Sequence, residues 1–376
     1  MRSKLPNVGT TIFTSMSKMA LDYGAINLSQ GFPNFPVDPM LLAILERKAL
    51  ENVHQYAPMP GNPELLGNIG NLIHKTYHRI NNPSSEILIC AGATEAIFAT
   101  IQALVSSGEE VIMFDPSYDC YEPPILLSGA RPIRIPMTDE LKPDWNLLKE
   151  KISHKTRMII INNPHNPSGR ILEEEDFVIL EDILKDRPDV ILLSDEVYEF
   201  ITFERKHISI NTRKNLINQS VIVSSFGKTF HITGWKIGYL IAPELLLKEI
   251  KKVHQFLVFS VNSIAQAVLA DYLNHIQVAE LGPFYKEKRD YFRTLMQGSK
   301  FELLSSEGTY FQLAKYNEIS NVSDVDFCKK LVKEFGVAAI PLSVFNEDGK
   351  DLKLIRFCFA KDNDTLEQAA EKLCKI

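Results

Sequence analysis

Short apolar runs alternate with amphipathic segments through the middle of the chain. The apolar runs predict strands over 87–90, 110–114, 157–161, 190–194, 221–225 and 239–242. Apolar positions at helical spacing predict helices near 94–107, 173–186 and 244–258. Strands that alternate with helices form mostly parallel sheets covered on both faces. The pattern therefore predicts an α/β protein with such a sheet at its centre.

The order of predicted helices and strands changes from about residue 276. A long helix is expected around 280–297, followed by strands at 310–314, 337–341 and 352–360 and a closing helix. We read this part as a smaller α/β domain. The N-terminal segment is expected to join it, after crossing from the large domain near residues 30–40. The predicted division is 1–35 for the N-terminal segment, 36–275 for the large domain and 276–376 for the small domain.

Composition and charge exclude several classes of protein. The 376 residues carry a net charge of −6, which argues against a nucleic-acid partner because such proteins need a basic face. No stretch approaches the ~20 apolar residues of a membrane span, so no membrane partner is expected. The 5 cysteines are scattered and form no CxxC, which is typical of reduced thiols in a cytoplasmic protein.

Two histidines have the spacing of a metal-binding pair. His74 and His78 stand four residues apart in HKTYH, as a pair of ligands on a helix would. No third ligand is evident, and the segment is typical of a polar helix surface. We therefore predict no metal.

Candidate catalytic and ligand-binding side chains are most concentrated in one segment, SSFGKTFHITGWKIGY, at 224–239. Lys228 stands beside a glycine and small hydroxyl residues at the end of a predicted strand, a setting that suits an amine nucleophile forming a Schiff base with an aldehyde. The hydroxyls of Ser225 and Thr229 and the cation of Lys236 could hold a phosphate nearby. The competing interpretation is a polar junction between a strand and a loop.

A second phosphate-binding element is predicted where the strand at 87–90 turns into a helix. Gly92, Ala93 and Thr94 occupy this turn, and the exposed amides of a helix N-terminus bind phosphate well. Many such turns only connect two elements. Together with Ser225 and Lys236, however, the turn offers the parts of one phosphate site.

Two segments suit a flat, nitrogen-containing ring. Asp195 ends the predicted strand in LLSDEVYEF. Burial of a carboxylate in so apolar a segment is costly unless it faces a cation, such as a protonated pyridine nitrogen. The alternative is that Asp195 caps the next turn. Glu196 beside it is expected to be structural or to lie at the rim. Tyr118, in FDPSYDCYEP, could stack on the ring or simply pack in its loop.

Two further residues could bind polar groups of a ligand. Asn166 lies in NNPHNPSGR, a rigid loop with fixed amide donors, where it could donate to a phenolic oxygen. We predict a cis bond between Asn166 and Pro167. Arg356, in LKLIRFCFA, has the planar fork that binds a carboxylate through two hydrogen bonds, the alternative being a structural salt bridge.

In this order and spacing, the segments resemble the class I aminotransferases, pyridoxal-phosphate (PLP) enzymes of fold-type I, over nearly the whole chain. The resemblance implies that Lys228 binds the cofactor aldehyde, that Asp195 pairs with the pyridine nitrogen, and that both act in catalysis together with Tyr198. It implies that Tyr198 and Asn166 hold the phenolic oxygen of the cofactor, while Tyr118 stacks on its ring. The phosphate would be held by Ala93, Thr94, Ser225 and Lys236. The resemblance also implies that Arg356 binds the substrate α-carboxylate together with Gly31 and Asn166, that the turn at Gly31 closes over the substrate, and that Tyr56 reaches the phosphate of a partner subunit in a homodimer with shared sites.

The spellings LSQGFPNFP, HQYAPMPG, FDPSYDCYEP and EGTYF resemble the bacterial methionine aminotransferases and the related kynurenine aminotransferase/glutamine transaminase K group. Two departures stand out. Lys236 replaces the arginine of much of the class, and AGATEA lacks a serine that several relatives carry near the phosphate. A point charge still suits a phosphate, so we expect activity to survive. The implied reaction is ping-pong transamination between an amino acid and a 2-oxo acid, a step of amino acid metabolism.

Substrate choice is predicted from the N-terminal loops. No arginine stands out there for a second carboxylate, whereas Ile12, Phe13, Phe32 and Tyr56 offer apolar or aromatic surface. This favours methionine, phenylalanine, tyrosine, glutamine or kynurenine over aspartate. The alternatives are a kynurenine/glutamine aminotransferase and a cysteine-conjugate C–S β-lyase on the same fold. Two non-catalytic classes are disfavoured. A PLP-binding transcriptional regulator would need a basic helix-turn-helix, which the sequence does not show, and a binding protein with an inactive site would not need Lys228, Asp195 and Arg356.

Overall fold

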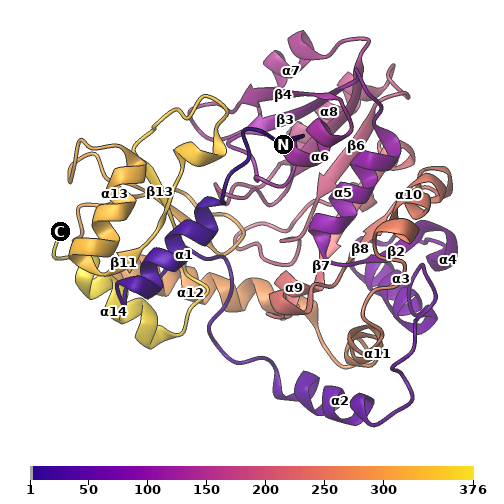
Figure 1. The fold of residues 1–376 in the computed structure, drawn as a ribbon, viewed down its shortest axis with the longest axis horizontal. Helices are drawn as coiled ribbons and strands as arrows, with labels where there is room; N and C mark the ends of the chain where they lie inside the picture. Colours follow the sequence, from indigo (N-terminus) through magenta and orange to yellow (C-terminus); the bar gives the residue numbers. More distant parts are fainter. Residues whose placement is uncertain (1–2) are drawn as a thin grey trace.

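The computed structural model describes residues 3–376, so the first two residues of the predicted N-terminal segment lie outside the described residues. Figure 1 shows the magenta and rose elements gathered around a large sheet. The orange and yellow C-terminal elements form a smaller lobe beside it, and the indigo helix α1 (Ile12–Asp22) lies against that lobe. The functional cavity described below lies where these two parts meet.

The large lobe is built on one sheet in the order β2-β8-β7-β6-β5-β3-β4. Its strands are β2 (Ile87–Cys90), β3 (Glu110–Asp115), β4 (Arg131–Pro136), β5 (Thr156–Asn162), β6 (Ile191–Asp195), β7 (Ser220–Ser225) and β8 (Gly238–Ile241). Every pair is parallel except those that β8 makes with β2 and β7. The prediction of an α/β protein with a mostly parallel sheet is therefore confirmed.

Helices cover both faces of this sheet, which explains why its central strands are continuous apolar runs. One face packs under α5 (Ala93–Leu104), α6 (Glu122–Leu127) and α10 (Glu244–Leu257). The other packs under α2 (Pro39–Ala49), α3 (Pro63–Tyr77), α7 (Trp145–Lys151), α8 (Glu174–Leu184) and α11 (Ser263–Tyr272). Two short helices, α4 (Pro83–Glu86) and α9 (Phe226–Thr229), complete the lobe.

Strand β4 is absent from the sequence-based expectations. It reads RPIRIP, in which Ile133 and Ile135 alternate with arginine and proline. The strand lies at the edge of the sheet, where only one neighbour has to be paired and proline is tolerated. It therefore never forms the continuous apolar run by which the central strands were predicted.

The smaller lobe holds a sheet in the order β12-β13-β10-β9, antiparallel throughout. Its elements are β9 (Glu302–Leu303), β10 (Phe311–Lys315), β12 (Ile340–Pro341), β13 (Leu354–Cys358), α12 (Leu281–Leu295), α13 (Asp324–Lys330) and α14 (Asn363–Leu373). The single strand predicted at 337–341 is wrong in one respect. The segment divides at Ala339 into β11 (Val337–Ala338) and β12, which belong to different sheets.

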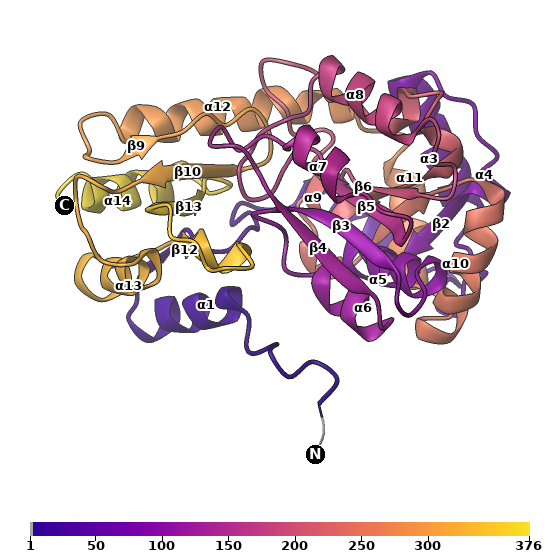
Figure 2. The same cartoon turned by 90° about the horizontal axis from the view of Figure 1, so that it is seen from above.

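The N-terminal segment packs on the smaller lobe before the chain enters the large one. Met16 and Ala20 of α1 are buried in the same apolar cluster as the C-terminal strands. Strand β1 (Ile26–Asn27) pairs in parallel with β11. Figure 2 shows α1 lying beside α13 and the C-terminal strands. We propose, on this packing, the division 1–35, 36–275 and 276–376.

No helix within residues 3–376 is long and apolar enough to cross a membrane.

Candidate active site

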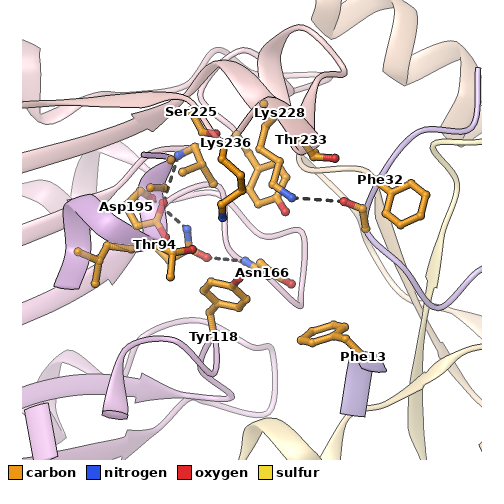
Figure 3. Close-up of a pocket in the computed structure, with 18 of the residues that line it drawn as sticks. Phe13, Phe32, Thr94, Tyr118, Asn166, Asp195, Ser225, Lys228, Thr233 and Lys236 are labelled. Carbon is orange, nitrogen blue, oxygen red and sulfur yellow. Dashed lines mark hydrogen bonds between the residues drawn. The ribbon is translucent and has the colours of Figure 1, made fainter. Parts of the chain in front are cut away.

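A cavity of about 380 Å³ opens where the parallel strands of the large sheet end. Eleven of the twelve residues to which the family resemblance gives a role line it: Gly31, Ala93, Thr94, Tyr118, Asn166, Asp195, Tyr198, Ser225, Lys228, Lys236 and Arg356. Figure 3 shows Lys228, Asp195, Asn166 and Tyr118 directed toward this common space. Phe13 and Phe32 lie on the side of the N-terminal segment.

The topology of the sheet accounts for this convergence. Asp195 is the last residue of β6, and Ser225 is the last residue of the neighbouring β7. Tyr118 and Asn166 lie in the loops that follow β3 and β5. Parallel strands present their carboxyl ends at one edge, and open α/β sheets bind ligands there.

Lys228 projects from the short helix α9 that follows β7. Its Nζ donates to the carbonyl of Gly31 at 3.3 Å and lies 5.6 Å from the ring centroids of both Tyr198 and Tyr310. Burial lowers the pKa of the Lys228 amine from 10.5 to about 8, and the cation of Arg356 acts in the same direction. A substantial share of this amine is therefore neutral, and hence nucleophilic, in mildly alkaline solution.

Asp195 is buried at the opposite wall of the cavity, with 3% of its surface exposed. Its Oδ2 accepts a hydrogen bond from the hydroxyl of Tyr121 at 2.7 Å, and its Oδ1 accepts one from the amide of Val197 at 3.2 Å. Burial raises the pKa of Asp195 to about 6, against the opposing effect of these two bonds. The turn-capping contact considered as the alternative is thus present, and the carboxylate still lines the cavity.

Tyr121 was missed by the sequence analysis. It is the second tyrosine of FDPSYDCYEP, three residues after Tyr118, and its ring is buried. The two rings meet edge to face, with centroids 5.8 Å apart. The pairing of an aromatic hydroxyl with Asp195 depends on the fold, because 74 residues separate the two positions.

The part of the cavity predicted to hold a phosphate, called the phosphate corner below, contains amides, a hydroxyl and a cation. Gly92 is the N-cap of α5 with φ 78°, and it provides no side-chain cap. The first amides of the helix, at Ala93 and Thr94, therefore remain available for an acceptor. Lys236 lies close by, since a Cβ at position 92 would be 3.6 Å from its Nζ. The hydroxyl of Ser225 lies at the same cavity wall.

The predicted phosphate hydroxyl at Thr229 is wrong. Its Oγ1 donates to the carbonyl of Ser225 at 3.1 Å, one helical turn back, and the side chain is buried away from the cavity. Thr233, at the start of a 3₁₀ turn (Thr233–Trp235), lines the cavity instead. The short helix α9 turns position 229 toward the protein interior, and strand-like spacing could not reveal this.

Arg356 reaches the cavity from β13 of the smaller lobe and is 1% exposed. Its Nη1 donates to Oδ1 of Asn166 at 2.6 Å, while its Nε has no partner among the described residues. No carboxylate within residues 3–376 forms a salt bridge with it, so the structural salt bridge considered from the sequence is not observed. A buried guanidinium without a counter-charge is costly unless a ligand supplies one.

The remaining predicted positions divide between the cavity and the surface. Tyr198 is buried, and its ring meets that of Tyr310 edge to face at 5.2 Å. Tyr56 is 80% exposed and packs on Phe259, with centroids 5.3 Å apart, so it does not reach the cavity of its own chain. Ile12 also lies outside the cavity lining.

Two local predictions are confirmed. The bond between Asn166 and Pro167 is cis. Glu196 is structural: it is 1% exposed, pairs with Nε2 of His207 at 2.9 Å and does not line the cavity.

These groups fit PLP on chemical grounds. The amine of Lys228 could bind an aldehyde, and the buried carboxylate of Asp195 could pair with a protonated ring nitrogen. The amides at Ala93 and Thr94, with the cation of Lys236, could hold a phosphate. Arg356, which forms no salt bridge among the described residues and whose Nε has no partner, would remain for a second, carboxylate-bearing molecule.

Comparison with known proteins agrees with this geometry. Residues 23–373 match the family described as Aminotransferase class I and II. The chain is 46% identical to the methionine aminotransferase of Escherichia coli over 379 residues, covering 100% of this chain and 98% of the relative. It is 32% identical to kynurenine–oxoglutarate transaminase 3 of Rattus norvegicus, covering 98% of this chain and 88% of that protein.

A crystal structure reported to identify a methionine aminotransferase function in an Escherichia coli protein superimposes with a TM-score of 0.97 at 45% identity, covering 100% of this chain and 99% of the other. The fold is therefore that of fold-type I, and the cofactor is PLP. The chain belongs to the class I and II aminotransferases.

Proposed function

We propose that the protein catalyses PLP-dependent transamination of methionine and other hydrophobic or aromatic L-amino acids with a 2-oxo acid acceptor. The observation that carries this proposal is the buried, carboxylate-free guanidinium of Arg356 in the same cavity as Lys228 and Asp195. This supports a site in which a group able to bind an α-carboxylate would lie beside an amine nucleophile and a buried acid.

The roles of the residues follow from their settings. Bound in the cavity, PLP supplies an aldehyde for amines and a ring that accepts the electron pair left when the α-proton departs. Lys228 would bind that aldehyde and, once released, its neutral Nζ would take the proton from the substrate Cα. Asp195 would hold the proton on the ring nitrogen, and Tyr118 would pack against the ring face.

Two residues would orient the substrate. Arg356 donates to Oδ1 of Asn166, so the amide Nδ2 of Asn166 is the donor left for an oxygen of the ligand. The guanidinium would bind the α-carboxylate in two hydrogen bonds and so direct the Cα–H bond toward Lys228. Tyr198 would share the phenolic oxygen of the cofactor with Asn166.

The preference for methionine is supported by the cavity walls. Its cationic lining residues are Lys228, Lys236 and Arg356, all assigned above. A distal carboxylate would therefore meet no further cation, whereas an apolar side chain would meet Phe13 and Phe32. The name of the Escherichia coli relative, at 46% identity, supports the same donor.

A homodimer with shared sites is part of the proposal. Phe256, Leu257 and Phe259 are exposed apolar residues at the end of α10, and Tyr56 packs on Phe259 beside them. We call these four residues the Tyr56 patch. We propose that a second copy covers this patch and receives the hydroxyl of Tyr56 at its phosphate. The 5 free cysteines support a cytoplasmic setting.

The test compares donors at equal acceptor concentration. We expect kcat/KM for L-methionine to exceed that for L-aspartate at least tenfold, which corresponds to about 1.4 kcal/mol. Lys228→Ala is the control and should abolish both activities. Equal rates for the two donors would overturn the proposed substrate class.

Two alternatives are separated in the same assay. Release of pyruvate and ammonia from a cysteine conjugate without added 2-oxo acid would identify a C–S β-lyase. A higher kcat/KM for kynurenine or glutamine than for methionine would place the enzyme with the kynurenine aminotransferases, a group represented by the Rattus norvegicus relative.

A further inference from the structure

A buried acid–base pair lies behind the phosphate corner of the cavity. Glu95 is in the first turn of α5, and His254 is near the end of α10. Nδ1 of His254 lies 3.0 Å from Oε1 of Glu95, and the two side chains are 0% and 8% exposed. Neither side chain lines the cavity, and the sequence analysis assigned them no role.

The second oxygen of Glu95 is bound to the phosphate turn itself. Oε2 accepts a hydrogen bond from the amide of Ala91 at 3.1 Å. Ala91 precedes Gly92, the N-cap that offers no side chain to the helix. In an ordinary capping box the third helical residue reaches back to the N-cap amide. Here Glu95 reaches one residue further back, so it fixes the turn and leaves the amides at Ala93 and Thr94 free.

The backbone around His254 is held by hydrogen bonds at the end of α10. Its carbonyl accepts hydrogen bonds from the amides of Val258 and Phe259, at 2.9 and 3.2 Å. The hydroxyl of Ser260, next along the chain, donates to the carbonyl of Ala57 at 2.9 Å. The backbone at position 254 is therefore held at the end of α10. The imidazole contacts Glu95 through Nδ1, and its Nε2 has no hydrogen-bond partner among the described residues, so Glu95 is the link between the end of α10 and the turn at 91–94.

A metal ion is the competing explanation for the cluster. Ligand atoms of Cys90, Glu95 and His254 lie within 4.8 Å of one another, the one such trio within residues 3–376. Both carboxylate oxygens of Glu95, however, already accept hydrogen bonds from nitrogen donors. An ion between Glu95 and Nδ1 of His254 would displace the bond that joins them, so the contacts favour hydrogen bonding.

We propose that Glu95 and His254 are a positioning pair for the cofactor phosphate. They hold the turn at 91–94 in the conformation that points the amides of Ala93 and Thr94 at the phosphate. The imidazole also gives the buried carboxylate a hydrogen-bond partner, without which its burial would be costly. The inference rests on the proposed function in one respect, that PLP binds with its phosphate at this corner.

The experiment measures the affinity of the cofactor-free protein for PLP and for pyridoxal, which lacks the phosphate. Glu95→Leu and His254→Phe each remove the pair, and we expect at least tenfold weaker binding of PLP with binding of pyridoxal changed less than twofold. Glu95→Gln can still accept from Ala91 and contact the imidazole, so it should stay within about threefold of the unmodified protein.

Thr100→Val is the matched control. Thr100 is buried on the same helix, and its Oγ1 donates to the carbonyl of Ala96, at 2.7 Å, away from the turn. Removing this bond should leave both affinities within twofold. Thermal unfolding of the cofactor-free variants, compared with that of this control, separates a general loss of stability from a local effect.

Three results would overturn the inference. They are unchanged PLP affinity in His254→Phe, an equal loss for PLP and pyridoxal, or a stoichiometric metal in the purified protein. If the unmodified protein itself fails to bind PLP, the proposed function fails and this inference fails with it. If the unmodified protein binds PLP and the variants bind it equally well, only the positioning pair is refuted.

Discussion

Asp195 shows how a single residue can reduce stability in exchange for chemistry. Its pKa is raised from 3.8 to about 6 in the cofactor-free protein, chiefly by burial. Because the folded state binds the proton more tightly than the unfolded state, ionisation of Asp195 lowers stability as the pH rises from about 4 to about 6. Above that range the loss is complete and constant.

Asp195→Asn should therefore stabilise the cofactor-free protein while it abolishes transamination. The unfolding free energy of the variant minus that of the unmodified protein should be about 1 kcal/mol larger at about pH 8 than at about pH 5. The reason is that ionisation of the buried carboxylate destabilises only the unmodified protein over this range. Urea unfolding at the two pH values measures the difference. An advantage that shrinks as the pH rises would contradict the burial of an ionisable carboxylate at this position.

Arg356 gives the second prediction at the scale of one residue. Arg356→Gln keeps a polar group near Asn166 but removes the charged fork. We expect kcat/KM for L-methionine to fall about 100-fold, or about 3 kcal/mol, the upper range for hydrogen bonds to charged groups. The decarboxylated amine of methionine should react equally with both proteins, since it lacks the carboxylate that we propose Arg356 binds. Equal losses for the two donors would assign Arg356 a structural role.

At the scale of elements, we propose that helix α1 contributes, through Phe13, to the apolar wall of the substrate site. Phe13 lines the cavity beside Phe32, and its ring lies 5.3 Å from the guanidinium carbon of Arg356. Phe13→Ala should lower kcat/KM for methionine about tenfold, the effect of losing roughly 1.5 kcal/mol of apolar contact, and leave that for aspartate unchanged. Ser15→Ala, on an exposed position of the same helix, is the control. A parallel fall for both donors would show that α1 does not select the side chain.

The central strands could be predicted from the sequence because each is buried on both faces and therefore forms an apolar run. Strand β4 could not, because an edge strand tolerates the arginine and proline residues that break its pattern. The division of the segment at Ala339 could not be predicted either. It arises because β11 pairs with β1 whereas β12 pairs with β13, and these pairings depend on the tertiary structure.

The candidate site divides in the same way. Lys228, Asp195, Asn166 and the turn at Gly92 were predictable because unusual polar residues follow apolar strands directly. Tyr121 and the pair of Glu95 and His254 were not, because their partners are distant in sequence. Glu95 and His254 are 159 positions apart in the sequence, and only the packing of α5 on α10 brings them together.

At the scale of the whole molecule, the cavity needs both lobes. Arg356 comes from the C-terminal strands, and its partner Asn166 lies 190 residues earlier, in the large lobe. Gly31, on the N-terminal segment, accepts hydrogen bonds from both Lys228 and Tyr310. A substrate held by Arg356 would therefore touch three separate parts of the chain at once.

The Tyr56 patch leads to a prediction about assembly. We expect a dimer in sedimentation experiments, and Phe256→Asp should convert it to monomers that retain less PLP. Phe256 is 86% exposed, so the substitution should not disturb the fold of one chain. Leu245→Asp, at the opposite end of α10 and 79% exposed, is the matched control and should remain dimeric. A monomeric unmodified protein with full activity would refute the shared site.

The most direct test of the central claim is the visible absorption spectrum of the purified protein, before and after addition of L-methionine without an acceptor. We predict an absorption band from PLP bound to Lys228 that bleaches as the amino group is transferred to the cofactor, and no such band in Lys228→Ala. A protein that shows no band even after PLP is added would contradict the assignment of Lys228 and the account built on it.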